Sequence, residues 1–388
     1  MKEAVIVSAV RTPVGKIRGS LASLQADQIA GHAVREAVKR AQIDPAEIED
    51  IYFGNCRNID VCTMARVVGQ EAGLPQSVPG MVVERGCGSA LCAIENAAVM
   101  IKAGEGQVYL AGGTESCTWE PFLMKRPQKF LSMPPEFVEG RMNPEGALEL
   151  NMGMTAEVVA ERFGVTRQDC DEFACLSQNR AAAAWADHRF DSQIVPIEVP
   201  GDKKGTTRIF DRDETVRETT MEGLAKLRSS FKEGGVCTAG NSSPLTDGAS
   251  ALIVMDKDLA KERGLKQLAT IKGFAAAALD PDIMGMGPVY STRKLLKKMK
   301  MELSDIDLIE INEAFAAQSV ACVRELNMDM DKVNVNGGAI ALGHPFGATG
   351  GILTAKMVYE LERQDKSVGL ITFCIGGGQG VAMLVERE

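Results

Sequence analysis

The sequence predicts an α/β fold made of two similar halves. Strand-like and helix-like segments alternate along its 388 residues, which is typical of largely parallel or mixed sheets covered by helices. A phrase also recurs, EIEDI at 47–51 and DIDLI at 305–309. Each copy follows a basic helix and a short turn, and each leads into a strand and an asparagine. Further on, a strand that runs into glycines also occurs in each half, in the same order along the chain. We therefore infer that one α/β unit is used twice.

The elements of the first half follow from apolar periodicity and from the positions of glycine. A continuous apolar run predicts a buried strand, and apolar residues three and four apart predict an amphipathic helix. The expected order is a strand at 4–9, a helix at 27–41, a strand at 50–53 ending at Gly54, a helix at 88–103 and a strand at 108–111 ending at Gly112-Gly113.

The second half repeats this order. A strand end at 312 opens a helix, another helix is expected at 348–360, and a strand at 369–373 runs into Gly376-Gly377-Gly378. A further strand is expected at 381–385, so the glycine cluster precedes a strand and not a helix. A dinucleotide-binding fingerprint therefore lacks its required context.

The middle of the chain differs from both halves. It holds Pro-rich and Met-rich stretches, a long helical pattern at 155–186 and a polar, charged loop at 201–217. We predict that 118–249 is an inserted loop domain that acts as a lid or binds a ligand. The N-terminal half is then 1–117, continued at about 250–268, and the C-terminal half is 269–388. Local positive charge comes from residues that also fit a solvated surface, namely Lys125, Arg126, Lys129, Lys203, Lys204 and Arg208.

Composition narrows the class of protein. Apolar residues make up 45% and charged residues 24%, ordinary values for a globular chain. The net charge of −9 argues against nucleic acid as a partner. We find no signal-peptide pattern and no apolar stretch of about 18 residues, so we expect a cytoplasmic protein with no membrane partner and with free thiols. CxxC, HxxxH and HExxH motifs are absent from the sequence, and no metal is expected.

Cys87 is the first candidate catalytic residue. It lies between Gly86 and Gly88, after a β-like run and before an apolar helix. At a helix N-terminus the helix dipole and unpaired amides lower a thiol pKa, which favours a nucleophile. A packed cysteine in a tight turn fits the segment equally well. Among the ten cysteines, all but Cys87 and Cys374 are expected to be small buried hydrophobes: Cys56, Cys62, Cys92, Cys117, Cys170, Cys175, Cys237 and Cys322.

His344 is the candidate base. It is the only one of the three histidines set among glycines, just before a predicted helix. By the internal repeat it occupies nearly the position in the second half that Cys87 holds in the first, so the two halves would bring both helix starts together. His32 and His188 lie in ordinary helical patterns, and we expect no functional role for them.

Two more residues complete a possible site. Cys374 stands beside the glycine turn 376–378, whose amides can face a reacting oxygen. Asn312 ends a strand, where it can hold a polar atom or a water, or serve as an ordinary helix N-cap. A thiol nucleophile, a base, a second proton-transfer group and oxyanion donors together suit acyl-thioester chemistry.

These residues resemble the thiolase family across essentially the whole chain. The motifs that carry the resemblance are Cys87-Gly88-Ser89, Asn312-Glu313-Ala314-Phe315, Gly343-His344-Pro345 and Cys374-Ile375-Gly376-Gly377-Gly378, supported by MGMTAE at 152–157 and TAGNSS at 238–243. The resemblance implies a duplicated, five-layered αβαβα core with an inserted loop domain that binds coenzyme A. From Asp280 onward the chain is most similar to acetyl-CoA acetyltransferases of the biosynthetic type.

The resemblance also implies roles. Cys87 would take the acyl group as a thioester, and His344 would accept the thiol proton and help hold the thioester oxygen. Cys374 would protonate the leaving group and remove the α-proton of the second acyl-CoA. Asn312 would position a water in one oxyanion hole, and the amides of Cys87 and Gly376 would form the other. The implied CoA contacts are Met152, Leu227, Ala239, Ser243, Met284, Ala314 and Phe315.

Three positions depart from the family pattern. Glu84 stands where many members have Asn, Ala90 where many have Gly, and Asn151 where biosynthetic relatives commonly have His. Asn151 adjoins the expected acyl pocket, so the preferred acyl-chain length stays open.

The implied function is reversible Claisen condensation and thiolysis of acyl-CoA thioesters by a ping-pong mechanism. The first choice is acetyl-CoA C-acetyltransferase, and the alternative is a degradative 3-ketoacyl-CoA thiolase of fatty acid β-oxidation. A ketoacyl synthase is less consistent, because Cys374 stands where a second His or an Asn would be needed. A non-catalytic lipid-binding relative is a third class, although all the catalytic residues of the family are present in this sequence. The expected partners are acyl-CoA, CoA and further copies of the chain, as a homodimer or as a homotetramer with a contact at 118–150; no cofactor is expected.

Overall fold

The computed structural model describes residues 2–126, 134–138, 140–144, 150–201, 203 and 205–387. The predicted basic residues Lys129 and Lys204 lie outside these ranges. The strands are β1 (Ala4–Arg11), β2 (Gly15–Lys16), β3 (Asp50–Gly54), β4 (Met81–Val83), β5 (Val108–Ser116), β6 (Leu123–Lys125), β7 (Glu136–Val138), β8 (Ile197–Pro200), β9 (Thr207–Phe210), β10 (Thr246–Asp256), β11 (Ala269–Ala278), β12 (Leu308–Ile311), β13 (Val368–Ile375) and β14 (Gln379–Glu386).

The helices alternate with these strands. The α-helices are α1 (Ala26–Ala41), α2 (Met64–Glu71), α3 (Ser89–Ala103), α4 (Met152–Phe163), α5 (Arg167–Ala186), α6 (Met221–Ala225), α7 (Lys257–Glu262), α8 (Gly287–Met299), α9 (Ala316–Leu326), α10 (Ala339–Leu342) and α11 (Thr349–Gln364). Short 3-10 turns are η1 (Pro45–Glu47), η2 (Pro281–Met286) and η3 (Leu303–Asp305). In the described part of the chain, no helix combines the length and the apolar character that a membrane span requires.

The main sheet shows the predicted duplication. Its order is β12-β13-β14-β11-β1-β10-β5-β3-β4. In the first half β3 runs parallel to β5, and β10 and β1 follow antiparallel. In the second half β12 runs parallel to β13, and β14 and β11 follow antiparallel. The halves meet where β1 pairs with β11 through Val5–Thr270 and Ile6–Ala269.

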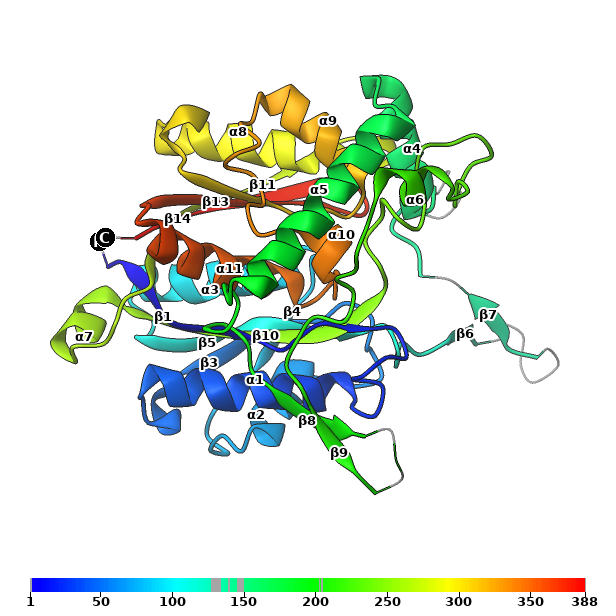
Figure 1. The fold of residues 1–388 in the computed structure, drawn as a ribbon. Coiled ribbons are helices and arrows are strands. Elements are labelled where there is room, and N and C mark those ends of the chain that lie inside the picture. The colour runs from blue at the N-terminus through cyan, green and yellow to red at the C-terminus, as the bar shows by residue number, and fades with distance from the viewer. Residues whose placement is uncertain are drawn as a thin grey trace.

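Helices cover and separate the two half-sheets (Figure 1). Helices α1 and α2 lie on the outer face of the first half-sheet, and α8 and α9 lie outside the second. Helices α3 and α11 pack against each other between the half-sheets. This is the αβαβα order that the thiolase resemblance implied. It brings the N-terminal ends of α3 and α11, which follow Cys87 and His344, into the centre of the molecule.

Two predicted boundaries in the core and the insertion were wrong. Strand β5 runs through Gly112 and Gly113 to Ser116 rather than ending at them. These glycines allow close packing, because a Cβ on Gly113 would lie 1.9 Å from the carbonyl oxygen of Gly347. The helical pattern at 155–186 is two helices, because Gly164 ends α4 with a left-handed φ of 63° and Thr166 caps α5.

The polar loop predicted at 201–217 contains a strand. Its residues Thr207–Phe210 form β9, which pairs with β8 in a two-stranded sheet. Near its end, Asp213 forms a buried bidentate ion pair with Arg11 of β1, at 2.7 and 3.0 Å. The segment is therefore anchored to the core by charge.

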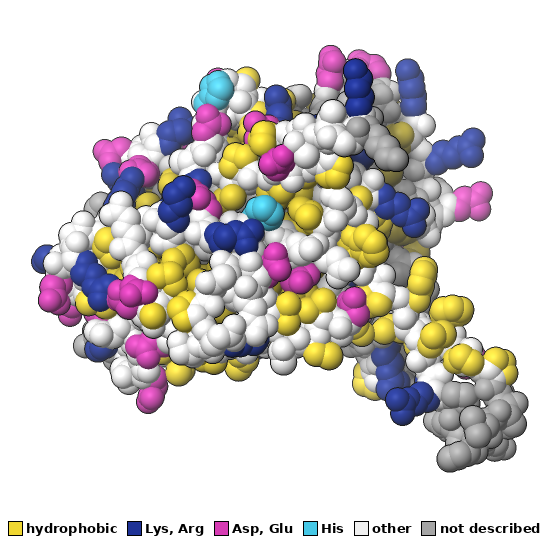
Figure 2. Space-filling model, turned by 90° about the horizontal axis from the view of Figure 1, so that it is seen from below, with side chains coloured by type: hydrophobic (Ala, Val, Ile, Leu, Met, Phe, Trp, Pro, Cys, Tyr) yellow, Lys and Arg dark blue, Asp and Glu magenta, His cyan; other side chains and the backbone are white. Residues whose placement is uncertain are grey.

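The β6–β7 hairpin projects from the body of the molecule (Figure 1). Its exposed side chains include Phe122 at 88%, Phe137 at 74% and Met124 at 58%. Figure 2 shows hydrophobic side chains along this arm. The domain boundaries drawn from the sequence stay a prediction.

Candidate active site

The turn before α3 presents Cys87. Helix α3 begins at Ser89, and Gly86 takes a left-handed φ of 48°. The Ser89 hydroxyl donates to the Gly86 carbonyl oxygen at 2.6 Å and accepts from the Arg85 amide at 2.8 Å. The bend is closed by Glu84, whose carboxylate accepts from the Gly86 amide at 2.8 Å. Glu84 is one of the three positions that depart from the family pattern, and here its carboxylate accepts the hydrogen bond that closes the turn.

The electrostatic state of Cys87 differs from the expectation. Burial raises the pKa of the Cys87 thiol to about 12, and it outweighs the amides of Cys87 and Gly376 and the Arg57 charge, which lower it. The prediction that the helix start gives a lowered pKa was therefore wrong. Desolvation by the packed surroundings of the half-buried Cys87 exceeds the effect of the helix N-terminus, because burial disfavours the charged thiolate. Cys87 needs a base to release its proton at neutral pH.

Cys374 and Gly376 come from the β13–β14 turn. Cys374 is buried, and burial followed by the neighbouring Cys87 and Cys322 thiols raises its pKa well above the ordinary value. The influence of Cys87 on this pKa reflects the proximity of two thiols from opposite halves of the chain. A Cβ on Gly376 would lie 2.4 Å from Met142 Sδ and 3.2 Å from Met152 Sδ. A side chain at position 376 would therefore displace these flexible methionine side chains.

His344 is held as a neutral base. Its Nδ1 lies 2.7 Å from the Thr349 hydroxyl, and that hydroxyl donates to the Pro345 carbonyl oxygen at 2.8 Å. The hydroxyl oxygen must then accept from Nδ1–H, which assigns the ring hydrogen to Nδ1. Nε2 keeps its lone pair and faces the Asn312 amide at 3.2 Å. Burial lowers the pKa of His344 to about 3, so the ring is neutral at physiological pH.

Asn312 joins the same cluster from the end of β12. Its amide nitrogen donates to His344 Nε2, while its buried Oδ1 has no hydrogen-bond partner among the described residues. It is not the N-cap of α9, because that position is Phe315. A buried acceptor without a partner is costly, and a water can satisfy it. The expectation that Asn312 holds a water stays a prediction.

The expected CoA contacts fall in one region. The Ser243 amide and hydroxyl both donate to the Ala314 carbonyl oxygen at 3.0 Å. Met284, Ala314 and Phe315 share an apolar cluster with Cys374, and Met152 packs against it. Leu227 and Ala239 are both exposed, and a Cβ on Gly240, the residue after Ala239, would lie 2.5 Å from Leu227 Cδ1. Their roles toward CoA stay a prediction.

The third departure from the family pattern, Asn151, caps a helix. Its side chain accepts from the Met154 amide at 2.9 Å at the start of α4. Ala90 is fully buried in α3.

All ten cysteines lie in the described part of the chain and are free thiols. Cys62 is exposed, and Cys56 and Cys175 are half-buried, so the expectation that these three are buried core residues was wrong. The Cys56 thiol donates to the Gly86 carbonyl oxygen at 3.2 Å, directly beside the turn of Cys87.

Sequence reasoning missed Thr349 and Phe346. Thr349 lies in the first turn of α11, where its hydroxyl reaches back to His344. The Phe346 ring meets the His344 ring edge-on at 5.0 Å, and the Arg57 guanidinium lies 5.2 Å from the Phe346 centroid. Nothing in the local sequence distinguishes these residues from ordinary helix-start and loop residues.

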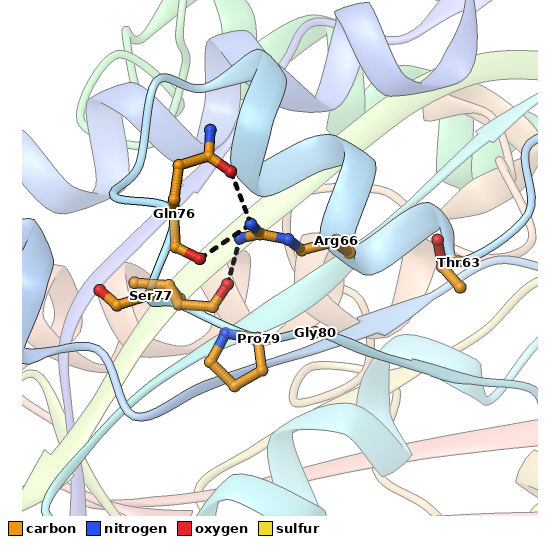
Figure 3. A pocket seen from close by; sticks show the side chains of 7 residues that line it. Thr63, Arg66, Gln76, Ser77, Pro79 and Gly80 are labelled. Atoms are coloured by element: carbon orange, nitrogen blue, oxygen red, sulfur yellow. Dashed lines mark hydrogen bonds between the residues drawn. The ribbon is translucent and has the colours of Figure 1, made fainter.

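A separate cavity lies beside α2 and β4. It measures about 370 Å³, and its lining includes Thr63, Arg66 and Gln76 (Figure 3). The Arg66 guanidinium donates to the carbonyl oxygens of Val78 and Gln76 and to the Gln76 side chain. None of the predicted site residues lines this cavity. Among the described residues we find no group of His, Cys, Asp and Glu that could hold a metal ion.

Comparison with known proteins identifies the family. The model of the thiolase N-terminal domain matches residues 4–258, and that of the thiolase C-terminal domain matches 265–387. The chain belongs to the thiolase family. An acetyl-CoA acetyltransferase from Pseudomonas aeruginosa is 43% identical, and one from Escherichia coli is 42% identical, each over 100% of both chains.

Solved thiolase structures share the fold. The crystal structure of the Bacillus anthracis acetyl-CoA acetyltransferase superimposes with a TM-score of 0.94 at 39% identity. Human mitochondrial 3-ketoacyl-CoA thiolase superimposes with a TM-score of 0.93 at 36% identity. Each comparison covers 100% of this chain and 99% of the other. The thiolase-like fold predicted from the sequence is confirmed.

Proposed function

We propose that this protein is a thiolase that condenses two acetyl-CoA molecules to acetoacetyl-CoA and CoA, reversibly and by a ping-pong mechanism. The observation that carries the proposal is the neutral His344. Its unprotonated Nε2 accepts from the Asn312 amide at the centre of the fold, where Cys87 and Cys374 approach from opposite halves. The full-length identity to acetyl-CoA acetyltransferases supports the same activity.

The first half-reaction loads the enzyme. Cys87 gives its proton to His344 Nε2 as its sulfur attacks the thioester carbon, because a free thiolate is unfavourable at a pKa of about 12. The amides of Cys87 and Gly376 donate to the oxyanion of the tetrahedral intermediate. The C–S bond to CoA then breaks, and Cys374 supplies a proton to the departing CoA thiolate. The product is an acetyl thioester on Cys87.

The second half-reaction forms the carbon–carbon bond. Cys374, now a thiolate, removes a proton from the methyl group of a second acetyl-CoA. The enolate oxygen is stabilised by His344, which carries the proton from Cys87, and by a water held at Asn312. The enolate carbon attacks the acetyl-Cys87 carbonyl, and the Cys87 thiolate leaves with the proton from His344. Cys374 is at that point protonated, which restores the starting state.

The alternative is a degradative 3-ketoacyl-CoA thiolase that accepts longer chains. The structural similarity to human mitochondrial 3-ketoacyl-CoA thiolase favours this candidate. Met152 and Met284 at the apolar side of the site favour the short chain, because large side chains leave little room for a long acyl group.

A thiolysis assay separates the two functions. Purified protein is offered CoA with acetoacetyl-CoA or with medium- and long-chain 3-oxoacyl-CoA, and Cys87→Ser is the matched control. The proposal expects the highest kcat/KM with acetoacetyl-CoA and no turnover by the control. Higher kcat/KM with the longer chains would replace it by the alternative, and no turnover of any 3-oxoacyl-CoA would refute both.

We further propose a homodimer or homotetramer. The exposed Phe122 and Phe137 of the β6–β7 hairpin support a contact between copies at 118–150. Light scattering of the wild type and of a Phe122→Ser, Phe137→Ser variant tests it, and an unchanged mass would exclude this hairpin as the contact. A cytoplasmic location and a role in fatty acid metabolism stay predictions.

A further inference from the structure

Glu115 is a fully buried acid with no role in the reaction just described. It lies near the end of β5, and its carboxylate accepts hydrogen bonds from two loops that belong to opposite halves of the chain. On one side it accepts from the amides of Cys56 at 3.1 Å and Arg57 at 3.0 Å. On the other side it accepts from the amide of Gly347 at 3.0 Å. The Asn55 side chain adds a fourth donor at 3.3 Å.

The first loop supports the nucleophile. Its Cys56 thiol donates to the Gly86 carbonyl oxygen at 3.2 Å and lies 3.4 Å from the Ser89 hydroxyl. Gly86 and Ser89 flank the turn that carries Cys87. Displacement of the Cys56 loop would therefore remove a contact from the carbonyl directly before the nucleophile.

The second loop carries the base. Gly347 follows His344 by three positions, and its amide is fixed by Glu115. The loop is also pressed against β5, since a Cβ on Gly347 would lie 2.4 Å from the Thr114 carbonyl oxygen. Thr349 and Asn312 hold the His344 ring, and the Thr246 hydroxyl accepts from the His344 amide. Glu115 holds the loop that follows His344.

The bridge needs an anion. A carboxylate accepts hydrogen bonds at both oxygens, whereas an amide or a protonated acid would point a hydrogen at one of the donors. Burial raises the pKa of Glu115, and the amides of Arg57 and Gly347, together with Cys56, lower it. The charged and titratable groups that face this carboxylate are Cys56, Arg57, Cys87 and Cys117.

We propose that Glu115 is a positioning residue for acyl transfer: its carboxylate ties the His344 loop to the loop behind Cys87, so that base and nucleophile from the two halves face one substrate. The inference rests on the proposed function. Glu115 itself does not touch the substrate. A misplacement of about 1 Å at reacting atoms can cost about 100-fold in rate, so loss of this bridge is expected to slow acylation by about that factor.

Glu115→Gln tests the proposal, with Asp307→Asn as the matched control. Asp307 also accepts two backbone amides, those of Ser367 and Val368, but at the opposite end of β12 from Asn312. We would measure the rate of Cys87 acetylation by acetyl-CoA in rapid-quench mass spectrometry, steady-state kcat and KM, and the thermal unfolding midpoint. For Glu115→Gln we expect acetylation and kcat to fall about 100-fold with an unchanged KM, and for Asp307→Asn no change in either rate.

A second readout separates positioning from stability alone. The charge of Glu115 raises the pKa of Cys87, so Glu115→Gln should move the pH dependence of iodoacetamide alkylation of Cys87 to lower pH while acetylation slows. Glu115→Asp keeps the charge but is too short to reach both loops, so it should slow acetylation without that pH displacement. Glu115→Asp takes the place of Glu115→Gln in the acetylation measurement if Glu115→Gln does not fold.

The outcomes are distinct. If the wild type is not acetylated, the proposed function fails. If the wild type is acetylated and a folded Glu115 variant is acetylated at the same rate, the positioning role is overturned. A lower unfolding midpoint with normal acetylation and normal pH dependence would also overturn it, because Glu115 would then be structural only.

Discussion

Thr349→Val should impair the base without touching any substrate. Valine has nearly the same shape as threonine but cannot accept the hydrogen bond from His344 Nδ1, which is 2.7 Å long and buried. The reactive tautomer then keeps an unpaired buried N–H, which costs about 1–3 kcal/mol. At about 1.4 kcal/mol per tenfold in rate, acetylation of Cys87 should slow about 5- to 150-fold.

Thr354→Val is the control for this prediction. Thr354 lies on the same helix, is fully buried, and donates to the Gly350 carbonyl oxygen at 2.7 Å. Its loss removes one buried hydroxyl from α11 but leaves His344 unchanged. Rapid-quench measurement of acetyl transfer to Cys87 compares both variants with the wild type. Equal acetylation rates in the two variants would refute the assignment of the hydrogen to Nδ1.

Three further predictions test other parts of the site and fold. Cys374→Ser should still become acetylated from acetyl-CoA but lose condensation, and retained acetoacetyl-CoA synthesis would exclude Cys374 as the second base. The pKa of His344 is about 3 in the folded protein and 6.5 when the side chain is free. Below pH 6.5 the unfolded chain therefore binds more protons than the folded protein. The free energy of unfolding should then fall by up to about 1.4 kcal/mol per pH unit as the pH is lowered from 6.5 toward 3. Urea unfolding at a series of pH values measures this dependence, which should be less steep in His344→Asn. An identical slope in the variant would contradict the lowered pKa of His344. Asp213→Asn leaves the fully buried Arg11 without its counter-charge and should cost about 3–5 kcal/mol in urea unfolding, whereas a loss below about 1 kcal/mol, typical of an exposed pair, would show that the pair does not anchor the segment.

The sequence was sufficient for the fold, and the catalytic roles of the candidate residues stay predictions. Alternation of strands and helices, the recurring phrase and the glycines beside Cys87 and His344 are local features. They correctly placed each residue in the loop that precedes a helix, α3 for Cys87 and α11 for His344. The duplicated order of β3-β5-β10-β1 and β12-β13-β14-β11 then brings the starts of these helices together.

The side-chain contacts that the folded loops make could not be predicted. The roles of Thr349 and Glu115 depend on hydrogen bonds made only after the loops are folded, and neither residue has an unusual neighbourhood in the sequence. The direction of the Cys87 pKa was wrong for the same reason, since the helix start is visible in the sequence and the depth of burial is not. The glycine pair was interpreted as a strand end because glycines commonly end strands. The real reason for Gly113 is the close approach of the Gly347 carbonyl, which is 234 positions away in the sequence and cannot be seen from it.

The most direct test of the central claim is to map the acetyl group after brief incubation with acetyl-CoA. Peptide mass spectrometry of the wild type should find one acetyl group on Cys87, with more of it retained in Cys374→Ser because the second half-reaction is blocked. Acetylation of Cys374 or Cys56 in place of Cys87, or no acetylation while the protein turns over acetoacetyl-CoA, would contradict it.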